Sequence, residues 1–231
     1  MEFIKTGVPG FDKVVNGGIR KNIALLLSGV PGTGKTIFGL QFIYFGAQNN
    51  ENCLFITCEE TAASILEYAK SIDIDFTRYK DKITVINQPL TGKIVSFGEI
   101  VSTIKKKNVQ RVVLDSLSVF DYITTNETAY RKEIANFISG MKESGVTLLV
   151  TAERPKEHLD EIEYRAEDFL FEGLVLFSKI RNGASYERCI TVAKMRGQKH
   201  LLGIYPFSLD EKGIEVFPDD LPFSLIAKEE K

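Results

Sequence analysis

Short apolar runs alternate with segments of helical spacing along the first two-thirds of the chain. The run Ile23–Ser28 (IALLLS) leads into a glycine and predicts a buried strand. The next segment has helical spacing and predicts a helix that ends at Asn49-Asn50; its apolar residues are Phe38, Leu40, Phe42, Ile43 and Phe45. The same alternation predicts strands over 53–57, 82–86, 111–114 and 147–151, with helices around 65–72, 100–104 and 134–141. Strands that alternate with helices indicate parallel pairing through right-handed crossovers.

The pattern changes after Gly173, where two strand-like runs follow each other without a helix. Leu174–Ile180 and Tyr186–Lys194 flank Asn182-Gly183, a strong signal for a hairpin turn. We therefore expect an α/β fold with a mostly parallel central sheet flanked by helices and a C-terminal antiparallel β extension. No repeat, low-complexity tract or flexible linker interrupts the sequence. We expect one domain over residues 1–231, with a short flexible tail from about residue 224.

Composition and charge narrow the class of protein. Of the 231 residues, 44% are hydrophobic and 26% are charged, as in ordinary soluble domains. The formal net charge of -2 gives no overall attraction to nucleic acid or to an anionic membrane. The longest apolar run, Ile23–Leu27, is far shorter than the ~20 residues of a membrane-spanning helix, and the first residues lack a secretory signal pattern. Cys53, Cys58 and Cys189 have no metal-binding spacing, so we expect reduced cysteines in a cytoplasmic protein.

The strongest motif directly follows the first predicted strand. The residues Gly29-Val30-Pro31-Gly32-Thr33-Gly34-Lys35-Thr36 match the phosphate-binding pattern G-x-x-x-x-G-K-[ST] at every position. Glycines let successive backbone N–H groups surround a phosphate, where a side chain would block the approach. Lys35 can reach the β- and γ-phosphates, and the Thr36 hydroxyl can bind Mg²⁺. A chance glycine turn would rarely fill every position between a strand and a helix, so we predict a loop that binds ATP and Mg²⁺.

Asp115 is the expected second metal ligand. It ends the apolar run Arg111–Leu114, and the ends of parallel strands lie at the sheet edge that carries the phosphate loop. A carboxylate at that edge can hold Mg²⁺ through water. Many buried strands end in a polar turn residue without any function, but the preceding phosphate loop favours the metal role.

The pair Glu59-Glu60 ends the second predicted strand at the same edge. A carboxylate there can orient and deprotonate the water that attacks the γ-phosphate. Alternatively, the two residues begin the next helix, where acidic side chains suit the helix dipole. We favour one catalytic carboxylate with one supporting partner.

Nearly the whole chain resembles the KaiC-like branch of the RecA superfamily of P-loop NTPases. The resemblance begins at Thr6-Gly7-Val8-Pro9-Gly10-Phe11-Asp12, continues through Gly17-Gly18-Ile19 and ends near Pro218. Its most specific part is Lys194-Met195-Arg196-Gly197, followed by His200 and Tyr205-Pro206-Phe207. The resemblance implies a RecA-like fold, slow ATPase activity and a homo-oligomeric ring, a hexamer, with ATP at each interface.

The resemblance also implies roles for individual residues. Glu59 and Glu60 resemble the family's catalytic glutamates, and Ser71 matches a position that contacts nucleotide. Lys194 and Arg196 would project into the ATP site of the neighbouring subunit. Gln198 and His200 would then lie near the base or ribose of that neighbour's nucleotide.

The residues themselves leave the role of the two cations open. Side chains spaced i, i+2 on a strand point to the same face, so Lys194 and Arg196 could converge on one polyphosphate. Basic residues on an edge strand also often serve only to keep that edge soluble. It is the resemblance that favours the trans-acting role.

Two features depart from the family's circadian-clock members. Those proteins carry two such domains in tandem, whereas this sequence holds one. The segment Ala166–Glu172, which resembles their autophosphorylation region, contains no serine or threonine. We therefore expect no autokinase activity at that place, although Thr124 and Thr125 remain as unassigned hydroxyls elsewhere.

Three classes of function compete. The first is a ring ATPase that regulates an unidentified protein partner, the second is a nucleotide-binding scaffold with negligible turnover, and the third is a DNA-handling relative of recombinases and helicases. In RecA-type DNA motors, two loops after the fourth and fifth strands bind DNA. Here Phe120–Thr128 contains no Lys or Arg, and Arg154–Asp168 has three Lys or Arg against six Asp or Glu. Because binding to nucleic acid phosphates needs positive charge along that path, we rank the DNA motor last.

Overall fold

The computed structural model describes residues 2–88, 97–154 and 162–225. Its strands are β1 (Phe3–Ile4), β2 (Ile19–Arg20), β3 (Ala24–Gly29), β4 (Asn52–Thr57), β5 (Ile83–Asn87), β6 (Val109–Asp115), β7 (Thr147–Glu153), β8 (Gly173–Asn182), β9 (Ser185–Met195), β10 (Ile204–Asp210) and β11 (Gly213–Val216). Its helices are α1 (Phe11–Val14), α2 (Lys35–Gln48), α3 (Ala62–Ser71), α4 (Phe97–Lys107), α5 (Val119–Ile123) and α6 (Glu127–Glu143), with 3-10 turns η1 (Phe76–Tyr79) and η2 (Ala166–Phe169). None of the helices in these ranges is long and apolar enough to cross a membrane.

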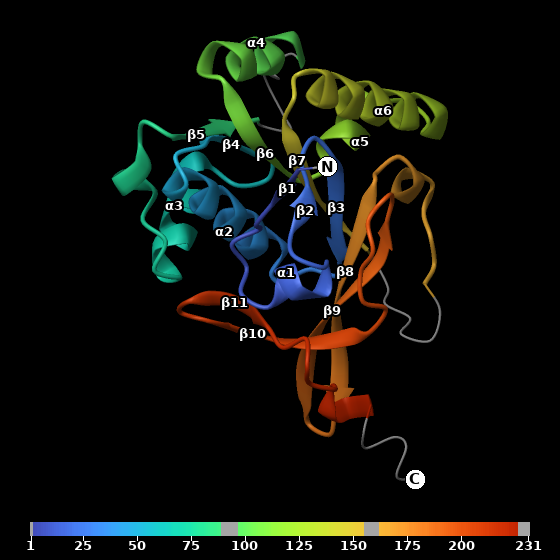
Figure 1. Cartoon of the computed structure of the whole chain (residues 1–231). Coiled ribbons are helices and arrows are strands. Elements are labelled where there is room, and N and C mark those ends of the chain that lie inside the picture. Colours follow the sequence, from blue (N-terminus) through green and yellow to red (C-terminus); the bar gives the residue numbers. More distant parts are fainter. Residues whose placement is uncertain (1, 89–96, 155–161, 226–231) are drawn as a thin grey trace.

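A nine-stranded sheet in the order β11-β10-β9-β8-β3-β7-β6-β4-β5 organises the molecule (Figure 1). The pairs from β8 through β3, β7, β6 and β4 to β5 are parallel, whereas β8, β9, β10 and β11 pair antiparallel. The predicted α/β fold, with a parallel centre and an antiparallel C-terminal extension, is therefore confirmed.

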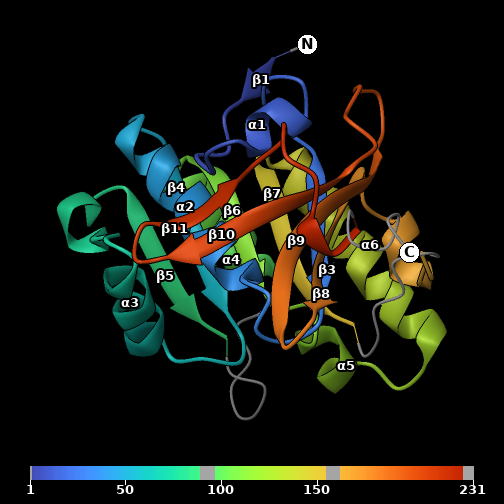
Figure 2. The same cartoon turned by 90° about the horizontal axis from the view of Figure 1, so that it is seen from below.

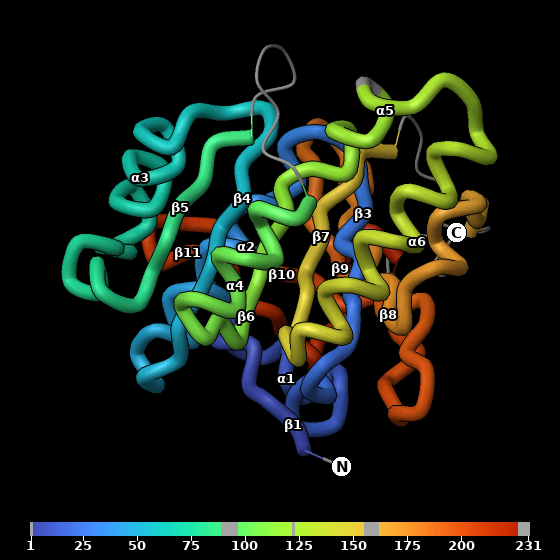
Figure 3. The backbone as a smooth tube through the Cα atoms, turned by 90° about the horizontal axis from the view of Figure 1, so that it is seen from above, coloured from blue at the N-terminus to red at the C-terminus, as the bar shows by residue number. Residues whose placement is uncertain are grey.

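Helices cover both faces of this sheet. One core packs α1, α2 and α3 with β10 and β11, while the other packs α4, α5 and α6 against the opposite face. Views onto the two opposite faces show this layering, with β10 and β11 in front of the strands in Figure 2 and α4 and α6 in front of them in Figure 3. Buried on both faces, β3 is apolar up to Ser28, as a central parallel strand requires.

The hairpin β8–β9 forms where it was predicted, with its turn shifted by one residue. The strands extend to Asn182 and Ser185, so the connecting loop is Gly183-Ala184. Gly183 has a φ of 59°, a value that two-residue hairpin turns need and glycine adopts without strain.

Sequence reasoning missed several short elements. β1 and β2 are two residues each, too short to show a period. Pro206 interrupts the pattern of β10, although a proline can occupy a strand where no ladder N–H is needed. Here the Pro206 carbonyl still accepts a hydrogen bond from the Phe217 amide at 3.0 Å.

The C-terminal segment packs against the hairpin further than expected. Ser224, predicted to lie in a flexible tail, is buried. The Glu187 carboxylate on β9 accepts hydrogen bonds from the Ser224 amide at 3.1 Å and from its hydroxyl at 2.9 Å. The Phe223 amide donates to the same carboxylate at 3.2 Å. The later tail, residues 226–231, lies outside the described residues.

The two segments compared with DNA-binding loops differ in what the structure describes. The first, 120–128, contains most of α5 and the start of α6, whose first turn is capped by the Asn126 side chain bonded to the Ala129 amide. Within the second, 154–168, residues 155–161 and therefore His158 lie outside the described residues. The C-terminal part of this second segment contains all of η2 except Phe169.

Arg111 on β6 joins three parts of the fold and is 2% exposed. Its guanidinium pairs with Glu51, donates to the carbonyls of Lys5 at 2.9 Å and Phe42 at 3.2 Å, and lies 4.6 Å from the centre of the Phe42 ring. A buried guanidinium is tolerated only when its charge is compensated and its donors are bonded. This one holds the N-terminal segment, α2 and β6 together.

We predict that Glu51→Gln destabilises the fold by about 2–4 kcal/mol, because it removes the charge that compensates buried Arg111. The loss should be smaller than for a fully buried pair, since Glu51 itself is partly exposed. Urea unfolding followed by circular dichroism measures this loss. The control Glu67→Gln, on the exposed face of α3, should change the free energy of unfolding by less than about 0.5 kcal/mol. Equal stability of the two variants would contradict the role assigned to Arg111.

Candidate nucleotide site

The phosphate-binding loop connects the end of β3 to the start of α2. Gly32 and Gly34 have φ values of 73° and 102°, so both positions use backbone conformations that favour glycine. A Cβ on Gly29 would lie 2.2 Å from the Phe177 carbonyl oxygen of neighbouring β8. The Thr33 hydroxyl closes the turn by donating to the Val30 carbonyl at 2.9 Å. The motif therefore has the strand-loop-helix context that phosphate binding needs.

Lys35 is the first residue of α2 and is 8% exposed. Its Nζ donates to the carbonyls of Gly29 at 2.9 Å and Val30 at 3.0 Å. The ammonium group is thus held against the inside of its own loop. This position puts a positive charge at the N-terminus of α2, where the helix dipole also favours an anion.

Asp115 ends β6 and lies against the start of α2. The Thr36 hydroxyl donates to its Oδ2 at 2.9 Å, and the Thr151 hydroxyl donates to its Oδ1. Burial raises the pKa of the Asp115 carboxyl, while the hydrogen bonds from Thr151 and Thr36 oppose that rise. The peptide bond between Asp115 and Ser116 is cis.

These oxygen atoms fit a magnesium ion. Mg²⁺ prefers hard oxygen ligands and usually binds through one or two protein groups together with water and substrate phosphates. A hydroxyl and a buried carboxylate next to a phosphate loop supply that set. Within the described ranges no cluster of three or more His, Cys, Asp or Glu side chains offers another metal site.

The structure distinguishes the two glutamates. Glu59 Oε1 accepts hydrogen bonds from the hydroxyls of Ser116 at 2.6 Å and Ser118 at 2.7 Å. These bonds place the carboxylate beside Asp115, and its charge also raises the pKa of Asp115. Both residues are exposed, but the bond at Glu60 is made by its backbone carbonyl, which accepts from the Thr57 hydroxyl at 2.9 Å. Of the two, Glu59 has the fixed geometry that a water-activating base needs.

Lys194 and Arg196 lie at the other end of the sheet from the phosphate loop. Lys194 pairs with Leu174, which in turn pairs with Leu26 on β3. The loop begins only after Gly29, about 10 Å further along the strands, and β9 is two strands away. A lysine stem of four carbons does not span this separation. Neither cation can therefore reach the loop of its own chain.

Both cations instead contact the turn η2. Lys194 Nζ donates to the Asp168 carbonyl at 2.5 Å, and Arg196 Nη2 donates to the Phe169 carbonyl at 3.0 Å. Their contacts with one turn agree with the prediction that they share a face. Burial and the neighbouring Arg196 charge lower the pKa of Lys194.

The other three predicted nucleotide contacts lie away from the loop. Ser71 ends α3, is exposed and donates to the Tyr68 carbonyl at 2.8 Å. Gln198 donates to the carbonyls of Val15 and Gly18, both at 2.5 Å, so its amide group holds the N-terminal segment. His200 is half-buried, with Nδ1 3.0 Å from the Leu201 carbonyl oxygen. Their roles with nucleotide remain predictions.

Sequence reasoning missed several residues around the site. Ser116, Ser118 and Thr151 follow or end buried strands at the carboxyl edge of the sheet, so the rule that selected Asp115 could have found them. Arg154 is different because its partners are distant in sequence. It donates to the Ser28 hydroxyl at 2.8 Å and pairs with buried Asp168, thereby connecting the strand before the loop to the turn that holds Lys194.

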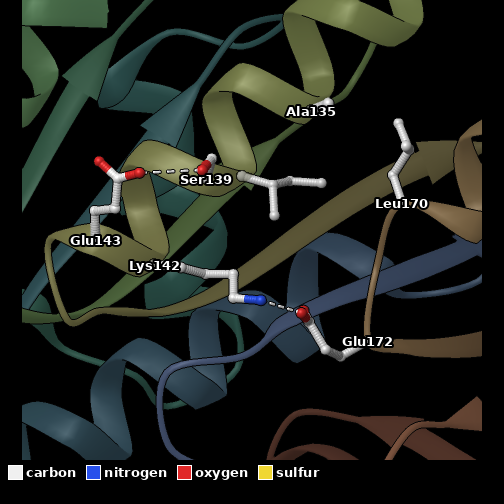
Figure 4. A pocket seen from close by; sticks show the side chains of 7 residues that line it. Ala135, Ser139, Lys142, Glu143, Leu170 and Glu172 are labelled. Atoms are coloured by element: carbon white, nitrogen blue, oxygen red, sulfur yellow. Dashed lines mark hydrogen bonds and ion pairs between the residues drawn. The ribbon is translucent and has the colours of Figure 1, made fainter.

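A hollow of about 440 Å³ lies beside α6 and can be excluded as the nucleotide site (Figure 4). Glu172 pairs there with Lys142 and accepts a hydrogen bond from the Ala24 amide at 2.9 Å. Ala24 begins β3, whereas the phosphate loop follows the last residue of that strand. The hollow is therefore at the amino end of the sheet.

Comparison with known proteins agrees with this geometry. A family model described as "ATPase: KaiC" matches residues 4–221. The chain belongs to the KaiC ATPase family. Membership in this family supports ATP binding and ATPase activity for the site at the carboxyl edge of the sheet.

Individual relatives are similar over almost all of the chain. A circadian clock oscillator protein KaiC of Acaryochloris marina is 31% identical over 228 residues, covering 93% of this chain and 44% of its own. The circadian clock protein KaiC3 of Synechocystis is 29% identical over 245 residues and matches along 48% of its length. The crystal structure of a KaiC-like protein from Pyrococcus horikoshii superposes with a TM-score of 0.82 at 29% identity, over 94% of this chain and 99% of that one. The chain thus spans about half the length of the two clock proteins.

We predict that Glu59→Gln lowers the rate of ATP hydrolysis by about 10²- to 10⁴-fold, because it removes the base beside Asp115. Glu60→Gln should lower the rate by no more than about tenfold, as expected for a supporting residue. Phosphate release measured under saturating Mg²⁺-ATP tests both variants, and binding of fluorescent ATP shows whether the nucleotide is still held. Glu67→Gln is the matched control. Full hydrolysis by both Glu59→Gln and Glu60→Gln would show that the water-activating carboxylate lies elsewhere.

Proposed function

We propose that this protein is a slow, Mg²⁺-dependent ATPase that forms a homo-oligomeric ring with each nucleotide shared between two subunits. The observation that carries the proposal is the separation of Lys194 and Arg196 from the loop of their own chain. Two cations on one face, both hydrogen-bonded to the turn η2, are well placed to act on a second copy. The ring of six subunits follows from the resemblance to KaiC-like proteins.

At the phosphate loop, different residues of the chain bind the metal ion, bind the phosphates and activate the water. When bound, Mg²⁺ neutralises charge on the β- and γ-phosphates. Thr36 would hold it directly and Asp115 through water. Lys35 provides a fixed charge at the start of α2, and Glu59, held by two serine hydroxyls, orients and deprotonates the attacking water.

The neighbouring subunit would complete the site. A cation that approaches the γ-phosphate from a second chain stabilises the charge that develops during phosphoryl transfer, an effect worth roughly 10³- to 10⁵-fold in rate. Arg196 is exposed and Lys194 lies beside it, so both can meet a partner surface. The head-to-tail contact that this requires closes into a ring when the rotation between subunits allows it.

A regulatory role in the cytoplasm, acting on a protein partner, suits such a ring better than a DNA motor. The acidic excess of Arg154–Asp168 and the absence of Lys and Arg from Phe120–Thr128 argue against binding to nucleic acid. A scaffold with negligible turnover is the second candidate, because ATP at an interface can stabilise an assembly without being hydrolysed. The fixed position of Glu59 favours hydrolysis. The lack of a hydroxyl in Ala166–Glu172 argues against autokinase activity there.

Mixed assemblies test the shared site. We predict that Lys35→Ala and Arg196→Ala subunits are each inactive alone, since one lacks a working loop and the other lacks the trans cation. In an equimolar mixture, roughly a quarter of the sites in a head-to-tail ring would combine an intact loop with an intact Arg196. Hydrolysis should return to about that fraction of the unsubstituted rate.

A subunit carrying both substitutions is the control, because it should give no recovery when mixed with either single variant. Light scattering confirms that each mixture has assembled. Full activity of Arg196→Ala alone would contradict the proposal, as would a mixed ring that assembles but regains nothing.

A further inference from the structure

A second lysine lies at the phosphate loop, on a neighbouring strand. β8 pairs in parallel with β3, and Phe177 is the partner of Gly29, the first residue of the motif. β8 continues past this point to Asn182, so Lys179 lies level with the loop. Lys179 lies two residues after Phe177, so both side chains are on the same face of β8. That face packs toward α2.

The Lys179 ammonium group contacts the loop directly. Its Nζ donates to the Pro31 carbonyl at 3.2 Å. It also lies 3.2 Å from the position that a Cβ on Gly32 would take. Lys35 bonds to the carbonyls of Gly29 and Val30, so two lysines from different elements bind three successive carbonyls of the same loop.

A third cation stands opposite Lys179. Arg188 on β9 is its direct cross-strand partner, which places the two side chains on the same face of the hairpin. Like charges opposite each other in a sheet are destabilising unless an anion lies between them. The Nε of Arg188 is buried without a hydrogen-bond partner among the described residues. A buried donor without a partner, opposite a lysine that contacts the loop, favours a negatively charged ligand on this face.

We propose that Lys179 binds the phosphate chain of the nucleotide held by the loop of its own subunit. Arg188 adds positive charge beside it. This inference rests on the proposed function, because the ligand is the polyphosphate of ATP or ADP. Lys179 acts in cis and from the opposite side of β3 to Asp115 and Glu59, which distinguishes it from the trans cations Lys194 and Arg196.

The competing explanation is that Lys179 only fixes the shape of the loop through the Pro31 carbonyl. Three variants separate charge from hydrogen bonding. Lys179→Arg keeps the charge, Lys179→Gln keeps a donor for the carbonyl but has no charge, and Lys179→Met has neither. Lys80→Met is the matched control, since Lys80 is exposed and follows η1 at the far edge of the sheet.

The test is the dissociation constant of fluorescent ATP and ADP for each variant of the full chain, with unfolding midpoints measured in parallel. We expect Lys179→Gln and Lys179→Met to bind both nucleotides about tenfold to hundredfold more weakly, as when a charged hydrogen bond is lost. Lys179→Arg should stay within about threefold and Lys80→Met should be unchanged.

Two results would overturn the inference while leaving the proposed function intact. One is unsubstituted affinity in all three variants. The other is full affinity of Lys179→Gln with weak binding only by Lys179→Met, which would make the Pro31 bond the whole role. Failure of the unsubstituted chain to bind either nucleotide would instead overturn the proposed function and this inference together.

Discussion

The parallel pairing of β3 with β7 on one side and β8 on the other is the constraint on which the rest of the structure depends. Because β3 is buried on both faces, its register with its neighbours is fixed by packing. That register brings the phosphate loop, Asp115 and Thr151 to one edge of the sheet. The antiparallel return of β9 carries Lys194 to the opposite edge. The same strand pairing therefore gathers the loop residues at one edge and leaves Lys194 at the other, away from the loop of its own chain.

Burial of the Asp115 carboxyl at the carboxyl edge of the sheet lowers the stability of the fold when that group is ionised. Burial raises the pKa of Asp115 above its ordinary value of 3.8, so the fold binds this proton more tightly than the unfolded chain does. The stability linked to this group is therefore greatest at pH below 3.8 and is lost as pH rises through the native pKa. When it is ionised, this carboxylate carries a desolvation cost that a bound cation would offset. Thr36 and Thr151 reduce this cost through their hydrogen bonds.

Two ion pairs outside the nucleotide site, formed by buried Arg111 and Arg154, connect segments of the fold that are distant in sequence. Arg111 joins the N-terminal segment to α2 and β6, while Arg154 joins β3 to η2. The Arg154–Asp168 pair lies between the strand that precedes the phosphate loop and Lys194, because the Asp168 backbone carbonyl also accepts a hydrogen bond from Lys194. A chain of bonds thus connects Ser28, just before the loop, through Arg154 and Asp168 to Lys194.

Patterns of neighbouring residues predicted the elements that depend on short-range sequence. The loop Gly29–Thr36, the alternating strands and the hairpin near Gly183 all follow from residue types at short range. Strand order and register depend on contacts between distant segments, and these decide that Lys179 lies at the loop and Lys194 does not. Gln198 shows the same limit, since its contacts join it to Val15 and Gly18, which are 183 and 180 residues away in the sequence. Sequence reasoning singled out Lys194 and Gln198 without their neighbours, and it did not single out Lys179.

The most direct test of a shared site is Mg²⁺-ATP hydrolysis per subunit as a function of protein concentration, with the oligomer size recorded at each point. A site completed by a neighbour predicts negligible turnover in the monomer and a rise that parallels assembly. Full turnover in a monomer would remove Lys194 and Arg196 from the mechanism and contradict the account.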